Sequence, residues 1–333
     1  MENDILKQLL TEYDQKRINA EINLSKKMNE LYNKYPDLLR INEEIKSCGI
    51  KLSKEIILGH NVENIKQELI RLKNNKKTLL NKLNISEDDL SPNYECKICK
   101  DTGYVVENNS KNLCSCIKQK LLNIKYNKSN MNNIYNENFN TFDLNFYSPD
   151  VNEEKFKSKL SPRENIKKIR NICYDFIKKF DDPKTNNLLF VGNSGLGKTF
   201  LSNCIAYELL QKEKTVLYQT ASNMLDNIIN YKFGKSSSFG DVYENILNVD
   251  LLIIDDLGTE STNSIKCEEL FNIINSRLLN QTNNYFAKTI ISTNLNLKEL
   301  SEKYDERIVS RLIGSYDICR FFGDDIRLQK KRA

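Results

Sequence analysis

Residues 187–199 read NLLFVGNSGLGKT, and this stretch decides the fold. An apolar run leads into a turn that fits the pattern G-x-x-x-x-G-K-[ST], and a helical pattern begins at Lys198. The glycines let the backbone curl so that successive N–H groups point inward at phosphate oxygens, and the start of the helix adds a positive dipole end. The stretch therefore predicts a phosphate-binding loop between a strand and a helix.

Each residue of this loop is a candidate contact to ATP. The eight residues are Gly192, Asn193, Ser194, Gly195, Leu196, Gly197, Lys198 and Thr199. We expect the ammonium group of Lys198 to reach the β- and γ-phosphates, and the hydroxyl of Thr199 to bind Mg²⁺. The predicted ligands of the loop are therefore ATP and Mg²⁺.

Strands and helices alternate from this loop onward. The predicted strands cover residues 187–192, 215–220, 250–256, 288–294 and 317–323. Helical patterns follow the first three strands, at about residues 198–211, 221–232 and 268–279. This alternation is typical of a parallel sheet with helices on both faces. The sequence therefore predicts an α/β fold with a five-stranded parallel sheet.

Two carboxylates end the third predicted strand. Residues 251–256 read LLIIDD, so a buried apolar strand ends in acids at the edge of the sheet where the phosphate loop lies. We predict that Asp255 holds Mg²⁺, directly or through water. Asp256 occupies the position where many ATPases carry a water-activating glutamate, and its shorter side chain predicts slow hydrolysis. The alternative is that both acids only end a strand and begin a turn.

Three further polar side chains are candidates for the chemistry. Asn294 ends the fourth predicted strand, where it could orient the attacking water or contact the γ-phosphate, or serve as an ordinary turn residue. Arg307 and Arg311 are four residues apart, so on a helix they share one face. They could reach the γ-phosphate held by a neighbouring subunit. The alternative is a solvated basic face.

A cluster of four cysteines precedes the nucleotide-binding half of the chain. Cys96 and Cys99 form a C-x₂-C pair, and Cys114 and Cys116 follow after a short loop. Four thiolates at this spacing can close a tetrahedral Zn²⁺ site, with Gly103 allowing the sharp turn between them. The chain has nine cysteines, and an odd number disfavours a disulfide framework. The alternatives are a set of reduced, free thiols and an iron–sulfur cluster, although four-cysteine clusters usually show other spacings.

The remaining sequence predicts a division into four segments. Residues 1–90 show apolar positions at helical spacing, which predicts a helical domain that is either structural or a docking module for a partner protein. Residues 91–120 hold the predicted zinc module. Residues 121–140 are polar and Asn-rich, which predicts a linker that extends to residue 160. Residues 161–333 form the predicted nucleotide-binding domain.

Composition and the N-terminal sequence predict the location of the protein. The net charge of the 333 residues is +5, which permits contact with nucleic acid without requiring it. The first residues, MENDILKQLL, contain early acids and no basic region, which disfavours a signal peptide. The apolar runs are too short to cross a membrane. We therefore predict a cytoplasmic protein with no membrane partner.

Residues 230–241, NYKFGKSSSFGD, combine aromatic and basic side chains. These side chains are those of Tyr231, Lys232, Phe233, Lys235 and Phe239. Aromatic rings stack on bases and lysines contact phosphates, a combination that proteins use to bind single-stranded DNA. The alternative is a surface loop that contributes some aromatic residues to the core.

Taken in order, these features resemble the bacterial replicative helicase loaders, the DnaC/DnaI family of AAA+ proteins, with the IstB transposition helpers close behind. The residues that carry the resemblance are Cys96-x₂-Cys99-Lys100-Asp101-Thr102-Gly103, Cys114-x-Cys116, Asn138-Phe139-Asn140-Thr141-Phe142, and residues 192–199, 251–258, 292–294 and 306–312. The resemblance covers roughly residues 90–333. It implies a P-loop AAA+ domain without the helical lid of fuller AAA+ proteins.

The resemblance also implies roles for single residues. Asn294 resembles the sensor 1 residue, and Arg311 resembles the arginine finger. Arg307 then takes a supporting position before the finger. Arg327, after the last predicted strand, resembles a terminal arginine of the family.

The function implied by the resemblance is that of an ATP-dependent helicase loader with weak, Mg²⁺-dependent ATPase activity. Such a protein self-associates through AAA+ interfaces, binds a DnaB-like replicative helicase hexamer and delivers it to single-stranded DNA in replication initiation. Residues 1–90 would contact the helicase, and residues 230–241 the DNA. The alternatives are an IstB-like transposition helper that binds DNA and recruits a transposase, and a non-hydrolysing adaptor whose shape is set by ATP.

Overall fold

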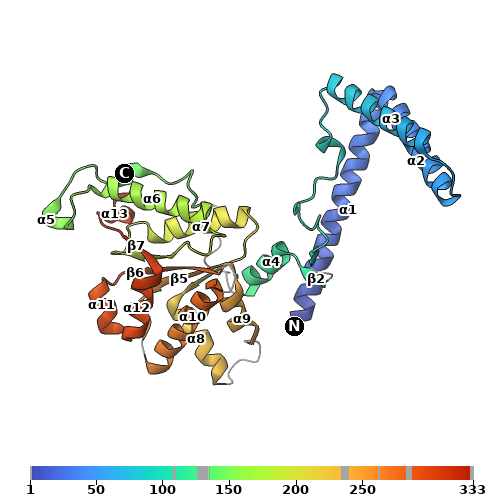
Figure 1. Cartoon of the computed structure of the whole chain (residues 1–333). Helices are drawn as coiled ribbons and strands as arrows, with labels where there is room; N and C mark the ends of the chain where they lie inside the picture. Colours follow the sequence, from blue (N-terminus) through green and yellow to red (C-terminus); the bar gives the residue numbers. More distant parts are fainter. Residues whose placement is uncertain are drawn as a thin grey trace. The chain divides into compact units, whose positions relative to one another are not determined.

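The computed structural model (Figure 1) describes residues 2–107, 110–125, 134, 136–233, 240–261, 263–282 and 287–330. The chain divides into two compact units, Met1–Cys114 and Ser115–Ala333. The first unit contains long helices and a small hairpin, and the second contains a sheet covered by helices. The observed division lies six residues before the predicted start of the linker at residue 121.

The N-terminal segment is helical, as predicted. Its long helices are α1 (Glu2–Lys34), α2 (Pro36–Ile57) and α3 (Glu63–Lys82). Pro36 stands in the first turn of α2, where a missing N–H removes no helical hydrogen bond. Helices α2 and α3 pack on each other, and Cys48 Sγ lies 3.7 Å from the carbonyl oxygen of Ile65.

The chain after α3 returns along α1. The elements here are η1 (Asp88–Leu90) and the antiparallel hairpin of β1 (Tyr104–Glu107) and β2 (Ser110–Leu113). An ion pair of 2.5 Å joins Lys16 of α1 to Glu95, and another of 2.8 Å joins Lys27 to Asp89. The helices and the residues leading to the cysteine cluster therefore belong to one compact unit, which contains the predicted boundary at residue 90.

The second unit begins with a helix, α4 (Ser115–Lys125). The side-chain amide of Gln119 pairs with the backbone of Val216 in both directions, at 3.0 and 2.7 Å. Val216 begins an edge strand, so α4 supplies hydrogen bonds that this strand would otherwise lack. Residues 126–133 and 135 of the predicted linker lie outside the described residues. Its later part contains η2 (Leu144–Phe146) and α5 (Glu153–Phe156).

The sheet of the second unit is parallel and has the five predicted strands. They are β3 (Asn187–Val191), β4 (Val216–Thr220), β5 (Leu251–Leu257), β6 (Lys288–Thr293) and β7 (Tyr316–Arg320). Their order in the sheet is β4-β5-β6-β3-β7. Because β6 lies between β3 and β5, the carboxyl ends of these three strands meet at one edge. The predicted phosphate loop and both predicted acids follow or end strands at this edge.

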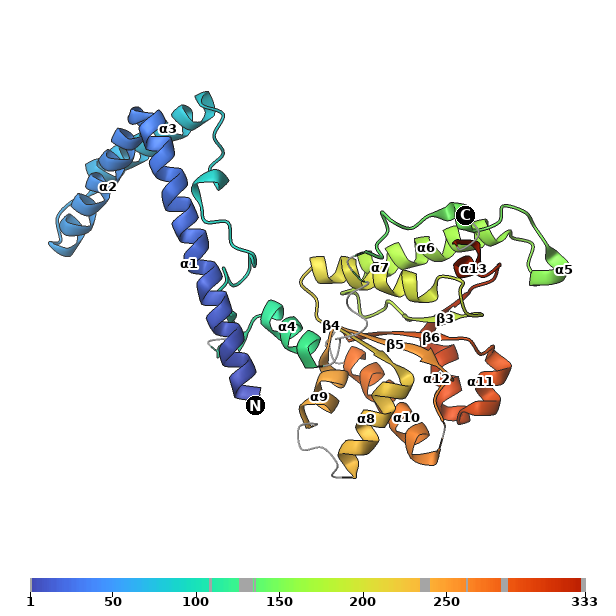
Figure 2. The same ribbon diagram turned by 180° about the vertical axis from the view of Figure 1, so that it is seen from behind.

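Helices cover both faces of the sheet (Figures 1 and 2). On one face lie α6 (Pro162–Lys178) and α7 (Lys198–Gln211). On the other lie α8 (Ala221–Lys232), α9 (Gly240–Asn248), α10 (Ser264–Thr282) and α12 (Glu306–Ser315). The remaining helices are α11 (Leu297–Lys303) and α13 (Ile326–Lys330). No helix within the described ranges is long and apolar enough to cross a membrane.

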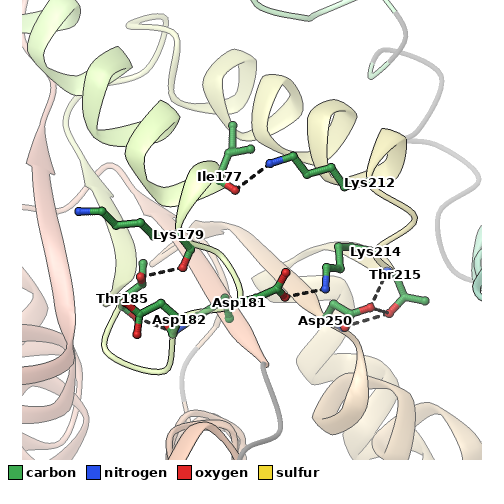
Figure 3. A network of polar contacts seen from close by, with 10 residues as sticks. Ile177, Lys179, Asp181, Asp182, Thr185, Lys212, Lys214, Thr215 and Asp250 are labelled. Carbon is green, nitrogen blue, oxygen red and sulfur yellow. Dashed lines mark hydrogen bonds and ion pairs between the residues drawn. The ribbon is translucent and has the colours of Figure 1, made fainter.

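Hydrogen bonds and an ion pair stabilise the amino-terminal edge of the sheet (Figure 3). The carboxylate of Asp250 accepts hydrogen bonds from the backbone N–H and the hydroxyl of Thr215, at 2.7 and 2.6 Å. Lys214 forms an ion pair with Asp181 at 2.6 Å. Asp250 and Thr215 immediately precede β5 and β4, so their contacts set the register of these strands. The same register aligns Thr220 with Asp255 at the opposite edge.

Candidate nucleotide-binding site

The glycines of the phosphate loop have backbone conformations that other residues rarely adopt. Gly195 and Gly197 have φ values of +76° and +92°. A Cβ atom at Gly197 would lie 2.5 Å from the hydroxyl of Tyr147, and one at Gly195 would collide with the carboxylate of Asp325. Only glycine fits at both positions. The loop forms a cradle of the kind that phosphate groups occupy, so its geometry fits a nucleotide.

Lys198 begins α7 and is nearly buried, with 5% of its surface exposed. Its Nζ atom donates to the carbonyl oxygens of Gly192 and Asn193, at 2.6 and 2.8 Å, and to Oδ1 of Asn294, at 2.7 Å. The structure thus brings together the loop lysine and the predicted sensor residue. These contacts pass between the ends of β3 and β6, which are neighbouring strands.

Asp255 is buried among three hydroxyl donors. Thr199 Oγ1 lies 3.2 Å and the Tyr218 hydroxyl 2.5 Å from Oδ2, while the hydroxyl of Ser292 donates to Oδ1. These donors come from α7, β4 and β6, so the carboxylate is oriented from three sides. A carboxylate beside a threonine hydroxyl is an oxygen donor set that suits Mg²⁺. Asp255 and Thr199 are therefore placed as one candidate Mg²⁺ site.

Asp256 has a left-handed backbone conformation, with φ of 55°, where the ladder between β5 and β6 is interrupted. Its side chain lines the same cavity as Lys198. Burial raises the pKa of Asp256, and the charge of Asp255 raises it further, whereas Lys198 and Arg327 oppose this shift. Burial also lowers the pKa of Lys198 to about 8, against the attraction of both carboxylates.

The cavity beside the loop has a volume of about 420 Å³ and a second wall that the sequence did not predict. This wall comes from Glu137, Thr141, Phe142, Asp143, Phe146 and Tyr147. The ring of Phe142 lies 5.6 Å from that of Phe200 on α7, and Tyr147 donates to the carbonyl oxygen of Leu196 at 3.1 Å. The aromatic and acidic composition of residues 137–147 was the available signal in the sequence. The prediction of a linker over residues 121–160 did not use this signal.

Arg327 also lines this cavity. Its Nη1 atom lies 3.5 Å from the hydroxyl of Ser194, and the neighbouring Ile326 donates its N–H to the carbonyl oxygen of Gly195 at 2.9 Å. The arginine therefore approaches the phosphate loop of its own chain.

Arg307 and Arg311 lie elsewhere, on α12. Neither contributes to the cavity wall. Their guanidinium carbons lie 4.7 and 4.5 Å from the ring centre of Phe271 on α10, so both arginines share one face of α12 as the spacing predicts. They are not brought to the phosphate loop of their own chain.

The four predicted zinc ligands lie together. The Sγ atoms of Cys96, Cys99, Cys114 and Cys116 are all within 4.8 Å of one another, and those of Cys96 and Cys114 are 3.8 Å apart. Tetrahedral Zn²⁺ with bonds of about 2.3 Å places its sulfur atoms roughly 3.8 Å apart. The donor set and its spacing therefore fit a Zn²⁺ ion.

Backbone groups around the cysteines are oriented by Asp101. This buried carboxylate accepts the N–H groups of Glu95 and Cys96, at 2.9 and 2.8 Å. The N–H of Gly103 points at Cys99 Sγ, at 3.3 Å. An N–H group directed at sulfur favours the thiolate form that metals bind.

The segment predicted to contact DNA is described only in part, because Lys235 and Phe239 lie outside the described residues. Tyr231 and Phe233 have 37% and 62% of their surface exposed. Lys232, however, forms an ion pair with the buried carboxylate of Glu269 on α10. This hydrogen bond raises the pKa of Lys232. Lys232 thus already has a partner, which the sequence pattern did not reveal.

The family assignment follows from a match that includes the phosphate loop. A family model described as "IstB-like ATP binding protein" matches residues 146–333, more than half of the chain. The chain belongs to the IstB-like ATP-binding protein family. In this IstB-like chain the matched region contains the sheet, the phosphate loop, Asp255 and Asp256, and the three arginines Arg307, Arg311 and Arg327. It excludes the cysteine cluster and most of the second cavity wall.

Replication proteins are among the relatives of this IstB-like chain. The replicative helicase loader DnaC of Escherichia coli strain K12 is 25% identical over 137 residues, which are 41% of this chain and 54% of DnaC. The chromosomal replication initiator protein DnaA of Oenococcus oeni is 35% identical over 138 residues, 40% of this chain and 29% of DnaA. The chain thus matches about half the length of DnaC. The predicted family is confirmed.

A solved structure of the DnaC helicase loader is also similar. It has a TM-score of 0.42 and 21% identity, covering 57% of this chain and 98% of that one. The AAA+ P-loop fold predicted from the sequence is confirmed by the family match and by the observed strand order.

Proposed function

We propose that this protein is an ATP-dependent helicase loader, which binds a DnaB-like replicative helicase hexamer and delivers it to single-stranded DNA. The observation that carries the proposal is the incomplete nucleotide site. The loop, Asp256 and Asn294 line one cavity and Asp255 contacts Thr199 beside it, while Arg307 and Arg311 lie outside the cavity. An arginine held away from its own site can serve the site of a neighbouring subunit. An ATPase of this kind hydrolyses ATP only when several subunits assemble, and a helicase loader also acts as an assembly of subunits.

ATP is the proposed ligand of the cavity, with Lys198 contacting its β- and γ-phosphates. Thr199 and Asp255 would hold Mg²⁺, which supplies positive charge to the phosphates when it is bound. Phosphate oxygens would compete with Asn294 for the ammonium group of Lys198, which now lies 2.7 Å from its amide oxygen. Release of Asn294 would free its amide to orient water. Phe142 and Tyr147 offer apolar surface to the base.

Hydrolysis in this proposal is slow. Asp256 is the carboxylate of the cavity that would activate water. Its side chain is one methylene shorter than that of a glutamate, so its oxygens reach less far toward the attacking water. The same feature supports a second candidate function, that of an adaptor in which ATP sets shape without turnover.

The proposed partners are assigned to different units. Residues 1–90, with the long helices α1, α2 and α3, would bind the helicase. The exposed rings of Tyr231 and Phe233, at the end of α8, would stack on bases of single-stranded DNA. Self-association would bring Arg311 of one subunit to the nucleotide site of a neighbouring subunit.

A pull-down with the replicative helicase of the same host tests the proposal. We expect the full-length protein to retain the hexamer, and the complex to bind a labelled single-stranded oligonucleotide more tightly with ATP than without it. Lys198→Ala should keep the helicase but lose the effect of ATP. No retention of helicase, with equal affinity for duplex and single-stranded DNA, would instead support the alternative of an IstB-like transposition helper.

A further inference from the structure

We propose that Phe271 and Asn275 of α10 are positioning residues that hold Arg311 in the orientation in which it reaches the γ-phosphate of a neighbouring subunit. The inference rests on the proposed function, because it takes Arg311 to act between subunits. Neither Phe271 nor Asn275 belongs to a nucleotide motif, and neither lines the cavity.

The aromatic ring of Phe271 contacts two arginines. The guanidinium carbons of Arg307 and Arg311 lie 4.7 and 4.5 Å from its ring centre, within the range of a cation–π contact. The ring is half-buried and packs against the core cluster beneath α10 and α12. Its position is therefore set by the core, and it gives both arginines a fixed surface.

The two arginines differ in their polar partners. Asp305 accepts from Arg307 through both carboxylate oxygens, at 3.0 and 3.1 Å, so a negative charge lies directly beside that guanidinium. Arg311 Nε donates to Asn275 Oδ1 at 2.9 Å, and its Nη1 donates to the carbonyl oxygen of Arg307 at 3.2 Å. Within the part of the chain that the structure describes, no ion pair involves Arg311.

Neutral partners have a specific consequence for Arg311. A carboxylate would hold the side chain but also cancel the charge that a phosphate must meet. A ring face, an amide oxygen and a backbone carbonyl hold the side chain and leave its net positive charge uncompensated. Ordering a long side chain before the anion arrives also removes an entropic cost from the binding step. Phe271 and Asn275 thus preorganise a cation without neutralising it.

The test compares variants of α10 with the loss of the arginine itself. Turnover of the full-length protein is measured at concentrations where the rate per site has stopped rising, and ATP binding is measured in dilute protein. Arg311→Ala should lower turnover by about 10³-fold or more, as expected for an arginine finger. Phe271→Leu and Asn275→Ala should each lower it about three- to tenfold, the range of one cation–π contact or one hydrogen bond. ATP binding should change by less than about twofold.

Conservative replacement and a double variant separate positioning from folding. Phe271→Tyr keeps the ring face and should restore turnover to near wild type. Leu278→Ala is the matched control, because Leu278 is half-buried on the same helix and packs against the same core cluster but offers an arginine neither a ring face nor an amide oxygen. It should reduce thermal stability with little loss of turnover per folded site. Phe271→Leu combined with Arg311→Ala should be no slower than Arg311→Ala alone.

Each contrary result has one meaning. Normal turnover in Arg311→Ala would remove the proposed role of Arg311, and the inference with it. A slow Arg311→Ala together with normal Phe271→Leu and Asn275→Ala would overturn the inference and leave the proposed function intact. Additive losses in the double variant, or no rescue by Phe271→Tyr, would show that Phe271 acts through the core and not through Arg311.

Discussion

At the scale of single residues, the ammonium group of Lys198 is fixed in position by hydrogen bonds, and its protonation depends on burial. Three oxygens of its own chain surround the ammonium group, and burial lowers its pKa to about 8. The amine is therefore charged below that pH and loses its proton above it, whereas in the unfolded chain it stays charged to about pH 10.5. Phosphates require the charged form, so nucleotide binding and protonation are linked.

This linkage predicts a pH dependence of ATP affinity. The dissociation constant should be nearly constant below pH 8 and should rise above it, approaching about tenfold for each pH unit. Calorimetric titration between about pH 7 and pH 9.5 measures it. Lys198→Ala should bind ATP far more weakly and show no such rise. A flat wild-type profile would mean that Lys198 does not supply charge to the nucleotide.

At the scale of elements, α10 connects regions that are distant in sequence. Glu269 pairs with Lys232 at the end of α8, and the guanidinium of the buried Arg277 donates to Ile246 O at 2.7 Å and to Lys288 O at 2.6 Å. Among the described residues, Oε2 of Glu269 has no hydrogen-bond partner, so the carboxylate depends on Lys232. A DNA phosphate could engage Lys232 only by competing with this buried acid.

Removing Lys232 should therefore destabilise the protein as well as weaken DNA binding. Lys232→Ala leaves the buried charge of Glu269 unpaired, and we expect the free energy of unfolding to fall by about 1–3 kcal/mol. The loss is smaller than for a fully buried pair because half of the Lys232 side chain is exposed. Urea unfolding measures the change.

A second variant isolates the DNA contact of Lys232. Glu269→Gln added to Lys232→Ala removes the unpaired charge and should recover most of the stability. If this double variant still binds single-stranded DNA as wild type does, over a series of salt concentrations, Lys232 contacts no phosphate.

The cysteine cluster makes a separate prediction at this scale. We expect about one Zn²⁺ per chain in protein purified without chelator. Cys114→Ser should lose the metal, and Asp101→Ala should weaken zinc affinity about 10- to 100-fold, because the N–H groups that it orients border the site. Cys267→Ser, outside the cluster, is the control and should keep its zinc. Metal analysis without zinc, together with four reactive thiols in the native protein, would contradict the prediction.

At the scale of the whole molecule, the proposed function requires more than one chain to complete the nucleotide site. Lys198 acts within its own chain and Arg311 would act in a neighbour. Arg311→Ala should therefore leave ATP binding by dilute protein nearly intact and lower turnover in the assembled state. Mixing Arg311→Ala with Lys198→Ala chains should restore part of the turnover, since one kind of mixed interface has both groups. Absence of rescue at every mixing ratio would mean that Arg311 is structural or acts within its own chain.

Much of the AAA+ domain could be predicted from short patterns. The loop at residues 192–199, the apolar strands and the spacing of the four cysteines are local features, because a strand needs only a run of apolar residues and a zinc knuckle only close thiols. The position of Asp255 at the carboxyl end of a strand follows in the same way. These patterns also indicated the family, which the match over residues 146–333 confirms.

The tertiary structure alone decided which side chains meet. The hydroxyls of Tyr218 and Ser292 reach Asp255 because β4 and β6 flank β5, and no sequence pattern states this strand order. Arg327 lies 3.5 Å from Ser194 of the phosphate loop, and Lys232 pairs with Glu269. The sequence pattern around each residue does not indicate either partner, because the partners are far apart in the chain. Hydrogen bonds and ion pairs depend on distances between residues far apart in the chain. A local sequence pattern predicts the strands, the helices and the chemical groups that they carry. The packing of strands and helices determines which of these side chains contact one another.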